Sequence, residues 1–224
     1  MDISKLDNFY SNSFSKDLKV KLCGLKKIED VKAAIKYGAD FLGFVFYKES
    51  LRNISLKTAQ EICDNFPNLA SKVAVVVNPD IEQLKKIKYH LKPQFFQIHG
   101  NVTIDDIKKI KEYFGEIGII KAFNVTSKSD LEKSLDFCDY VDFFLYDAII
   151  SGEGRPFDWQ LLRNFSPKKE WFLSGGINSK NVFEAIKITN AKMIDVSSAI
   201  EVNKGEKSIK LIEEFMNLVH DKRN

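Results

Sequence analysis

The stretch KVKLCGLKKIEDVKAAIKYGADFLGFVF, residues 19–46, holds one complete strand, helix and strand, and it decides the fold. Its two ends, Lys19–Cys23 and Phe41–Phe46, are short runs rich in apolar residues, typical of strands buried on both faces. Between them, Glu29–Tyr37 has the apolar spacing of an amphipathic helix. This order predicts two parallel strands joined by a helical crossover.

The same order repeats along the rest of the chain. Further strands are predicted at Val73–Val77, Phe95–His99, Gly118–Phe123, Phe143–Asp147, Trp171–Ser174 and Met193–Ser197. Further helices are predicted at Leu56–Phe66, Ile81–Leu91, Ile104–Tyr113, Lys128–Phe137, Asn181–Ile188 and Lys207–Val219, with only a short piece near Asp158–Leu162. About eight repeats in roughly 200 residues predict an α/β protein, a single-domain (β/α)8 TIM barrel. A doubly wound open sheet is the alternative, but no GxGxxG follows the first strand.

Composition sets limits on partners and compartment. The chain has 224 residues, 44% of them hydrophobic, and a net charge of +3 with both signs interleaved, so we expect no nucleic-acid partner. Residues 1–17 are polar and resemble neither a signal peptide nor a membrane anchor, so we expect an N-terminal extension before a catalytic barrel of residues 18–224. Cysteines at 23, 63 and 138 form no disulfide or metal pattern, and we expect a cytoplasmic protein without membrane contact.

Chemically useful residues recur where the predicted strands end. A barrel gathers the carboxyl ends of its strands, and the loops after them, on one face where its chemistry takes place. The residues at these positions are Cys23, Arg52, Asn78, His99, Asp147, Gly175, Gly176, Ser197 and Ser198. We therefore expect them to converge although they span the whole chain.

The last two strand ends indicate a phosphate site. SGGIN at 174–178 offers two glycines for close backbone approach, and DVSSAIE at 195–201 offers hydroxyls and amides. Barrels often bind phosphate with the loops after strands seven and eight. The alternative is that these glycines only serve tight turns.

Cys23 and Asp147 are candidates for a base and an acid. A thiolate can remove a proton from carbon and a carboxylic acid can donate one to a leaving oxygen. The thiol then needs a lowered pKa and the carboxyl a raised one. The alternatives are a buried structural cysteine and an aspartate that caps a helix or pairs with Lys121.

Eight segments together resemble phosphoribosylanthranilate isomerase, in order and spacing from residue 18 to the end. They are residues 21–47 beginning with KLCG, SLRNIS (50–55), VAVVVNP (73–79), FQIHG (96–100), IIKAF (119–123), LYDAIISGEGRPFDW (145–159), WFLSGGINSKNV (171–182) and IDVSSAIE (194–201). The resemblance implies a single-domain barrel that rearranges N-(5-phosphoribosyl)anthranilate into 1-(2-carboxyphenylamino)-1-deoxyribulose 5-phosphate on the way to tryptophan. It implies a small phosphorylated substrate, no metal and no cofactor, and leaves monomer and homodimer open.

The resemblance also implies a role for each site residue. Asp147 matches the general acid that opens the ribose ring, and Cys23 the general base that takes the C2 proton. Arg52 should face the anthranilate carboxylate. His99 should lie near the same end of the substrate, or alternatively be a structural histidine whose hydrogen bonds are satisfied at its strand end. The phosphate side would be lined by Gly154 and the backbone around Gly176 and Ser198. Apart from the resemblance, the small residues of the loop at 149–156 permit a change of backbone conformation, which makes this loop a candidate lid.

Three positions depart from the family pattern. Leu51 and Asn53 flank Arg52 where a proline and an aromatic residue are common, and Ala199 stands where a glycine is usual. Other possibilities are a related phosphosugar barrel, including indole-glycerol-phosphate synthase, the histidine-pathway Amadori isomerase or a dual-substrate isomerase, and a non-catalytic sugar-phosphate binding protein. For the first two of these enzymes we expect a lysine or an aspartate where Cys23 stands.

Overall fold

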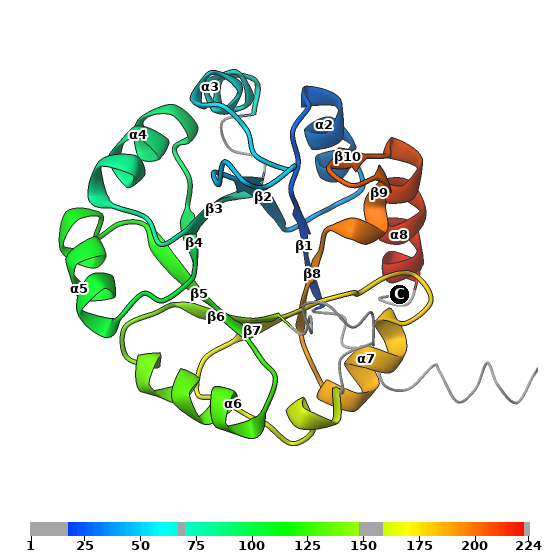
Figure 1. Ribbon diagram of the computed structural model, residues 1–224. Helices are drawn as coiled ribbons and strands as arrows, with labels where there is room; N and C mark the ends of the chain where they lie inside the picture. Colours follow the sequence, from blue (N-terminus) through cyan, green and yellow to red (C-terminus); the bar gives the residue numbers. More distant parts are fainter. Residues whose placement is uncertain (1–17, 67–69, 148–158, 222–224) are drawn as a thin grey trace, which may run out of the picture.

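The computed structural model of the chain describes residues 18–66, 70–147 and 159–221. Within them, eight parallel strands pair in sequence order and close into a barrel, with β8 beside β1 (Figure 1). The strands are β1 (Lys19–Cys23), β2 (Phe41–Val45), β3 (Ser71–Val77), β4 (Phe95–His99), β5 (Gly118–Asn124), β6 (Phe143–Asp147), β7 (Trp171–Ser174) and β8 (Met193–Val196). The (β/α)8 prediction is confirmed, and the open doubly wound sheet is ruled out.

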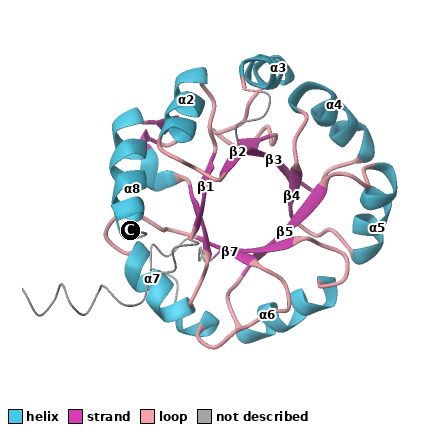
Figure 2. Cartoon of the chain, turned by 180° about the vertical axis from the view of Figure 1, so that it is seen from behind, coloured by secondary structure: helices cyan, strands magenta, loops and turns pink. Residues whose placement is uncertain are grey.

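Helices surround the barrel, as Figure 2 shows from behind. They are α2 (Ile28–Lys36), α3 (Leu56–Asn65), α4 (Ile81–Leu91), α5 (Ile104–Tyr113), α6 (Lys128–Ser134), η1 (Leu135–Phe137), η2 (Trp159–Leu162), α7 (Val182–Thr189), η3 (Ser198–Ile200) and α8 (Ile209–Asp221). Several begin at side-chain caps: Ser55, Asp80 and Thr103 each accept a hydrogen bond from a backbone N–H of the first turn. The apolar stripe of each long helix packs on the outer face of the strands.

One predicted element differs. The sequence predicts a helix from Lys207, but α8 begins at Ile209, and a short hairpin of β9 (Glu201–Asn203) and β10 (Glu206–Lys207) precedes it. The hairpin turns at Gly205, whose φ of 84° is in the left-handed region that favours glycine. Lys207 therefore belongs to a strand after β8 and not to the last helix.

Aromatic rings fill the barrel near the amino ends of its strands. Phe41, Phe95, Phe143 and Phe172 point inward from β2, β4, β6 and β7. Their rings meet edge to face, with centroids 5.1 Å apart for Phe41 and Phe172 and 5.5 Å for Phe95 and Phe143. This apolar plug leaves the carboxyl ends of the strands as the place where inward-facing polar side chains gather.

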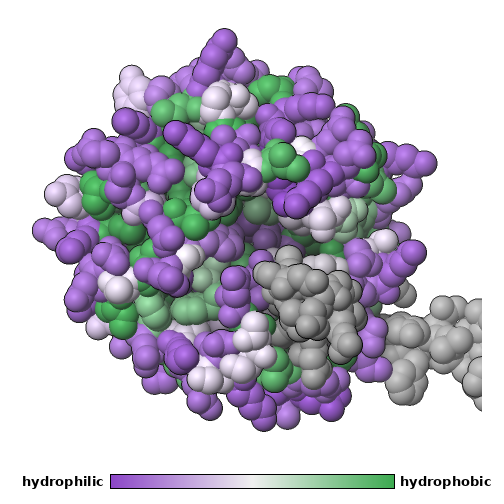
Figure 3. Space-filling view, viewed as in Figure 1, coloured by the Kyte–Doolittle hydropathy of each residue, from purple (hydrophilic) through white to green (hydrophobic). Residues whose placement is uncertain are grey.

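The face of the molecule at the carboxyl ends of the strands is mainly hydrophilic where the structure describes it. Figure 3 shows polar side chains over most of one face, with hydrophobic ones scattered between them. No helix among the described residues is both long enough and apolar enough to cross a membrane.

Candidate active site

The predicted site residues meet in one cavity. It has a volume of about 270 Å³ and lies at the carboxyl ends of the strands. Its lining includes Cys23, Arg52, His99, Asp147, Gly175, Gly176, Ser197 and Ser198. Asn78 is not part of this lining, and its side chain lies against Gly100. Gly154 and the candidate lid at 149–156 lie outside the described residues.

Cys23 ends β1 and is nearly buried, with 7% of its surface exposed. Its carbonyl oxygen accepts a hydrogen bond of 3.1 Å from Ser197 Oγ, which joins β1 to the loop after β8. Burial raises the pKa of the thiol, while Lys21 acts in the opposite direction. The lowered pKa expected for a base is therefore not found for Cys23, because desolvation outweighs the nearby cation.

Asp147 ends β6 on the inner face of the barrel and lines the cavity. Lys121, a partner considered for it, lies on the outer face of β5, where its Nζ donates to the carbonyl oxygens of Gly100 and Ala122 at 3.1 and 3.0 Å. Burial lowers the pKa of Lys121 to about 8. Because side chains alternate along a strand, Asp147 and Lys121 occupy opposite faces of the sheet.

The loop after β7 depends on its two glycines. Gly175 and Gly176 have φ values of 93° and 69°, which disfavour any side chain. A Cβ added at Gly176 would have no described atom within 4 Å, so its backbone borders open space beside the cavity. This loop can bring backbone close to a ligand, and its glycines also serve the turn.

Ser197 and Ser198 follow β8, where the short η3 begins. Lys207 Nζ donates to Ser197 O at 2.9 Å and lies 3.3 Å from Ser197 Oγ. Lys207 itself has a fully buried side chain. Lys207 thus stabilises the loop after β8, which the sequence predicts to bind phosphate.

Arg52 is held by a carboxylate of the same hairpin. Its Nε and Nη2 donate to the two carboxylate oxygens of Glu201 at 2.7 and 2.8 Å, a bidentate pair. Lys207 Nζ donates to Glu201 Oε1 at 2.8 Å. Burial alone would raise the pKa of Glu201, but the hydrogen bonds from Arg52 and Lys207 hold it at about 2, below its ordinary value of 4.5.

We expect Glu201→Gln to lower the free energy of unfolding by about 3 kcal/mol at pH 7, because it leaves the buried Lys207 without its counter-charge. Since the folded pKa of Glu201 is depressed, its stabilisation is complete above about pH 4.5 and is lost as the pH falls to about 2. The difference between wild type and variant should therefore shrink over that range in urea denaturation series.

Glu206→Gln is the matched control, because Glu206 is an exposed residue of the same hairpin. It should change the free energy of unfolding by less than about 0.5 kcal/mol. A Glu201→Gln deficit that stays constant between pH 5 and pH 2.5 would show that the ionised carboxylate is not what stabilises the hairpin.

His99 ends β4 at the cavity, with its Nε2 2.8 Å from Gln97 Nε2. Burial, and then Lys21 and Lys121, lower the pKa of His99 to about 4. The imidazole is therefore neutral near pH 7. The contact with Gln97 agrees with a structural role for His99, as a histidine whose hydrogen bond is satisfied at its strand end. The ring also lines the cavity.

Sequence reasoning missed several charged or polar residues of this region. They are Lys21, Gln97, Asp195, Glu201 and Lys207. One of them carried a visible signal, because Asp195 interrupts the otherwise apolar strand Met193–Val196.

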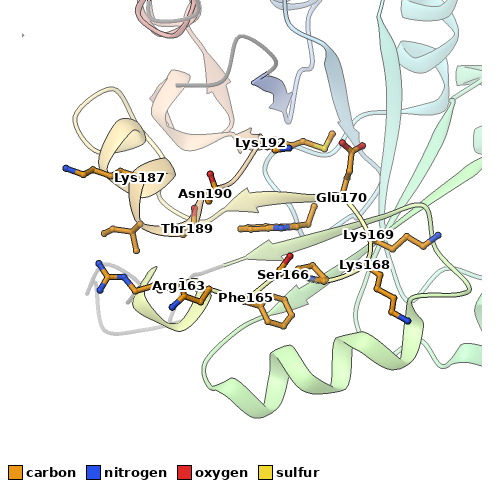
Figure 4. Close-up of a pocket in the computed structure, with 15 residues that line it drawn as sticks. Arg163, Phe165, Ser166, Lys168, Lys169, Glu170, Lys187, Thr189, Asn190 and Lys192 are labelled. Atoms are coloured by element: carbon orange, nitrogen blue, oxygen red, sulfur yellow. The ribbon is translucent and has the colours of Figure 1, made fainter. Parts of the chain in front are cut away.

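A larger cavity of about 580 Å³ lies at the amino ends of β7 and β8. Figure 4 shows that its cationic side chains diverge: Lys168 and Lys169 extend to one side, Arg163 and Lys187 to the other. Charges that diverge cannot surround one anion. The chemistry-bearing side chains are instead gathered in the smaller cavity at the opposite strand ends.

Comparisons with known proteins agree with this site. The family model described as N-(5'-phosphoribosyl)anthranilate isomerase matches residues 20–218. The enzyme of that name from Parvibaculum lavamentivorans is 36% identical over 208 residues, covering 89% of this chain and 96% of the relative. The one from Rhizobium johnstonii is 38% identical, covering 89% of this chain and 93% of the relative.

Solved structures give the same result. The phosphoribosyl anthranilate isomerase of Thermotoga maritima superposes with a TM-score of 0.83 at 32% identity, covering 91% of this chain and 99% of that one. A complex of such an isomerase with reduced 1-(o-carboxyphenylamino)-1-deoxyribulose 5-phosphate has a TM-score of 0.79, with the same identity and coverage. The family match spans nearly the whole barrel, including every described strand end that lines the cavity. This chain is thus an enzyme of the phosphoribosylanthranilate isomerase family.

Proposed function

We propose that this enzyme rearranges N-(5-phosphoribosyl)anthranilate into 1-(2-carboxyphenylamino)-1-deoxyribulose 5-phosphate, the isomerase step of tryptophan biosynthesis. The observation that carries the proposal is the meeting of a thiol, Cys23, and a carboxyl group, Asp147, in one cavity with Arg52 and the two positive-φ glycines. Family membership supports the same reaction.

In the first step, Asp147 gives its proton to the ribose ring oxygen. The bond from C1 to that oxygen breaks, and the lone pair of the anthranilate nitrogen forms a C1=N double bond. In the second step, the Cys23 thiolate removes the proton from C2. The C–H electron pair forms a C1=C2 double bond and neutralises the nitrogen, and the resulting enolamine tautomerises to the ketone.

Arg52 is proposed to bind the anthranilate carboxylate. Glu201 occupies the edge formed by Nε and Nη2, so the edge formed by Nη1 and Nη2 can take a second carboxylate. The phosphate is proposed to bind the backbone amides around Gly175, Gly176, Ser197 and Ser198, which line the same cavity. Gly154 remains part of this proposal from the sequence alone.

The test is the loss of anthranilate-type fluorescence when the purified full chain is added to freshly prepared phosphoribosylanthranilate. We expect loss much faster than the spontaneous rate. No acceleration, together with retained binding of a reduced product analogue by calorimetry, would favour a non-catalytic binding protein. A parallel assay with the substrate of the histidine-pathway isomerase separates a dual-substrate enzyme from a dedicated one.

A further inference from the structure

A lysine and an aspartate lie side by side inside the barrel, beneath the thiol. Lys21 on β1 and Asp195 on β8 are directly paired in the strand register, and Lys21 Nζ donates to Asp195 Oδ1 at 2.8 Å. Ser174 Oγ donates to the other carboxylate oxygen at 3.3 Å. The side chains of Lys21 and Asp195 are 0% and 7% exposed.

Such a buried pair is a poor source of stability, because its desolvation cost commonly equals or exceeds its Coulombic gain. Barrels fill equivalent interior positions with branched apolar residues, as this one does on β3 with Val73 and Val75. The charges at positions 21 and 195 therefore point to a role in the chemistry of the cavity above them.

Lys21 is adjacent to Cys23. The two residues are two positions apart on β1 and face the same way. Opposite Cys23, β2 carries Gly43, which has no side chain. A Cβ added there would lie 2.8 Å from Cys23 Sγ and 3.1 Å from Lys21 Nζ, so the thiol and the ammonium share the space that Gly43 leaves empty.

We propose that Lys21 is the counter-ion that allows Cys23 to become a thiolate, and that Asp195 holds Lys21 in place for this task. The proposal rests on the function above, because it explains how Cys23 can serve as the base. Lys21 acts through Cys23 and is a positioning residue.

The charges around the thiol support this role. Burial raises the pKa of Cys23, Lys21 and Lys207 lower it, and Asp195 raises it. Arg52, paired with Glu201, also interacts with the thiol, and neutral His99 and Asp147 line the same cavity. With Asp147 in the protonated form proposed for the acid, the cations Lys21, Arg52 and Lys207 face the anions Asp195 and Glu201. One positive charge remains, which a thiolate would neutralise.

Lys21 itself stays protonated. Burial would lower its pKa, but Asp195 and Cys23 more than offset this, so the pKa is raised. Without Lys21, the same surroundings carry no net charge before ionisation, and a thiolate would be an excess buried anion.

The experiment measures the rate of Cys23 carbamidomethylation by iodoacetamide from pH 6 to 10, using mass spectrometry of the peptide that contains Cys23. In Lys21→Met the Cys23 titration should move to higher pH by at least about one pKa unit. Alkylation at pH 7.5 should therefore slow at least about tenfold. In Asp195→Asn alkylation should instead be faster than in wild type. The asparagine Oδ1 can still accept the hydrogen bond that holds Lys21, whereas the negative charge that opposes the thiolate is gone.

Lys19→Met is the matched control, because Lys19 is an exposed lysine at the start of the same strand. It should leave the Cys23 titration unchanged, and the Cys138 peptide in each sample reports on reagent and folding. An unchanged titration in folded Lys21→Met overturns the proposal. If Lys21→Met does not fold, Asp195→Asn decides, and unchanged or slower alkylation overturns it. Alkylation does not require turnover. If the Cys23 titration shifts as expected in Lys21→Met but the wild-type protein has no isomerase activity, only the proposed function is contradicted.

Discussion

Asp147→Asn should lower kcat at least about 100-fold in the fluorescence assay while leaving the fold intact. The asparagine keeps the size and position of the side chain at the end of β6 but has no proton to give to the ribose ring oxygen. Ring opening would then depend on water, and loss of one general acid typically costs 10²–10⁴-fold. KM should change little, because the substrate's carboxylate and phosphate are proposed to bind Arg52 and the glycine loop.

Asp136→Asn provides the control, since Asp136 is exposed on η1 and does not line the cavity. It should retain wild-type turnover. Circular dichroism and the urea midpoint check that both variants fold. Asp147→Asn with near-normal kcat would remove Asp147 as the acid and would require the proton to come from another cavity group.

The fold could be predicted because each of its layers has a local signal. The strands are buried on both faces, so they stand out as short apolar runs between amphipathic helices, and the predicted bounds of β1, β4, β6 and β7 agree with the structure. The hairpin at Glu201–Lys207 was missed because its strands are short and polar. Its turn residue, Gly205, was its main sequence signal.

The cavity lining was predictable for a topological reason. In a barrel, any residue at the carboxyl end of a strand lies on one face, whatever its distance along the chain, so Cys23 and Asp147 could be brought together from the order of elements alone. Side-chain pairing was not predictable in this way. Arg52 and Glu201 are 149 positions apart, and their contact depends on a hairpin that the sequence did not reveal.

The inward position of Lys21 was hidden for a related reason. In Lys19–Cys23, lysines alternate with apolar residues, a pattern that an isolated strand would show if its lysines faced water. Closure of the barrel turns Lys21 inward, to a partner on β8 that is 174 positions away. The role of Lys21 therefore depends on a contact between the first and last strands, which forms only when the barrel closes.

Cys23→Ser should also lower kcat at least about 100-fold, and for a different reason. Serine is nearly isosteric with cysteine and keeps the Ser197 contact, which is made to the backbone carbonyl of residue 23. A hydroxyl, however, ionises far less readily than a thiol, so even a neighbouring Lys21 cannot supply a useful fraction of alkoxide near neutral pH. The C2 proton would have no base, although ring opening by Asp147 would still occur.

This difference makes the two variants distinguishable. If Cys23 acts after ring opening, Cys23→Ser should accumulate the open Schiff base, and borohydride should trap it as a reduced adduct found by mass spectrometry. Asp147→Asn should give little of that adduct, because it fails one step earlier. Cys138→Ser, at a half-buried cysteine outside the cavity lining, should turn over normally. Equal trapping in both variants, or a Cys23→Ser enzyme with near-normal kcat, would show that the thiol is not the base for the second step.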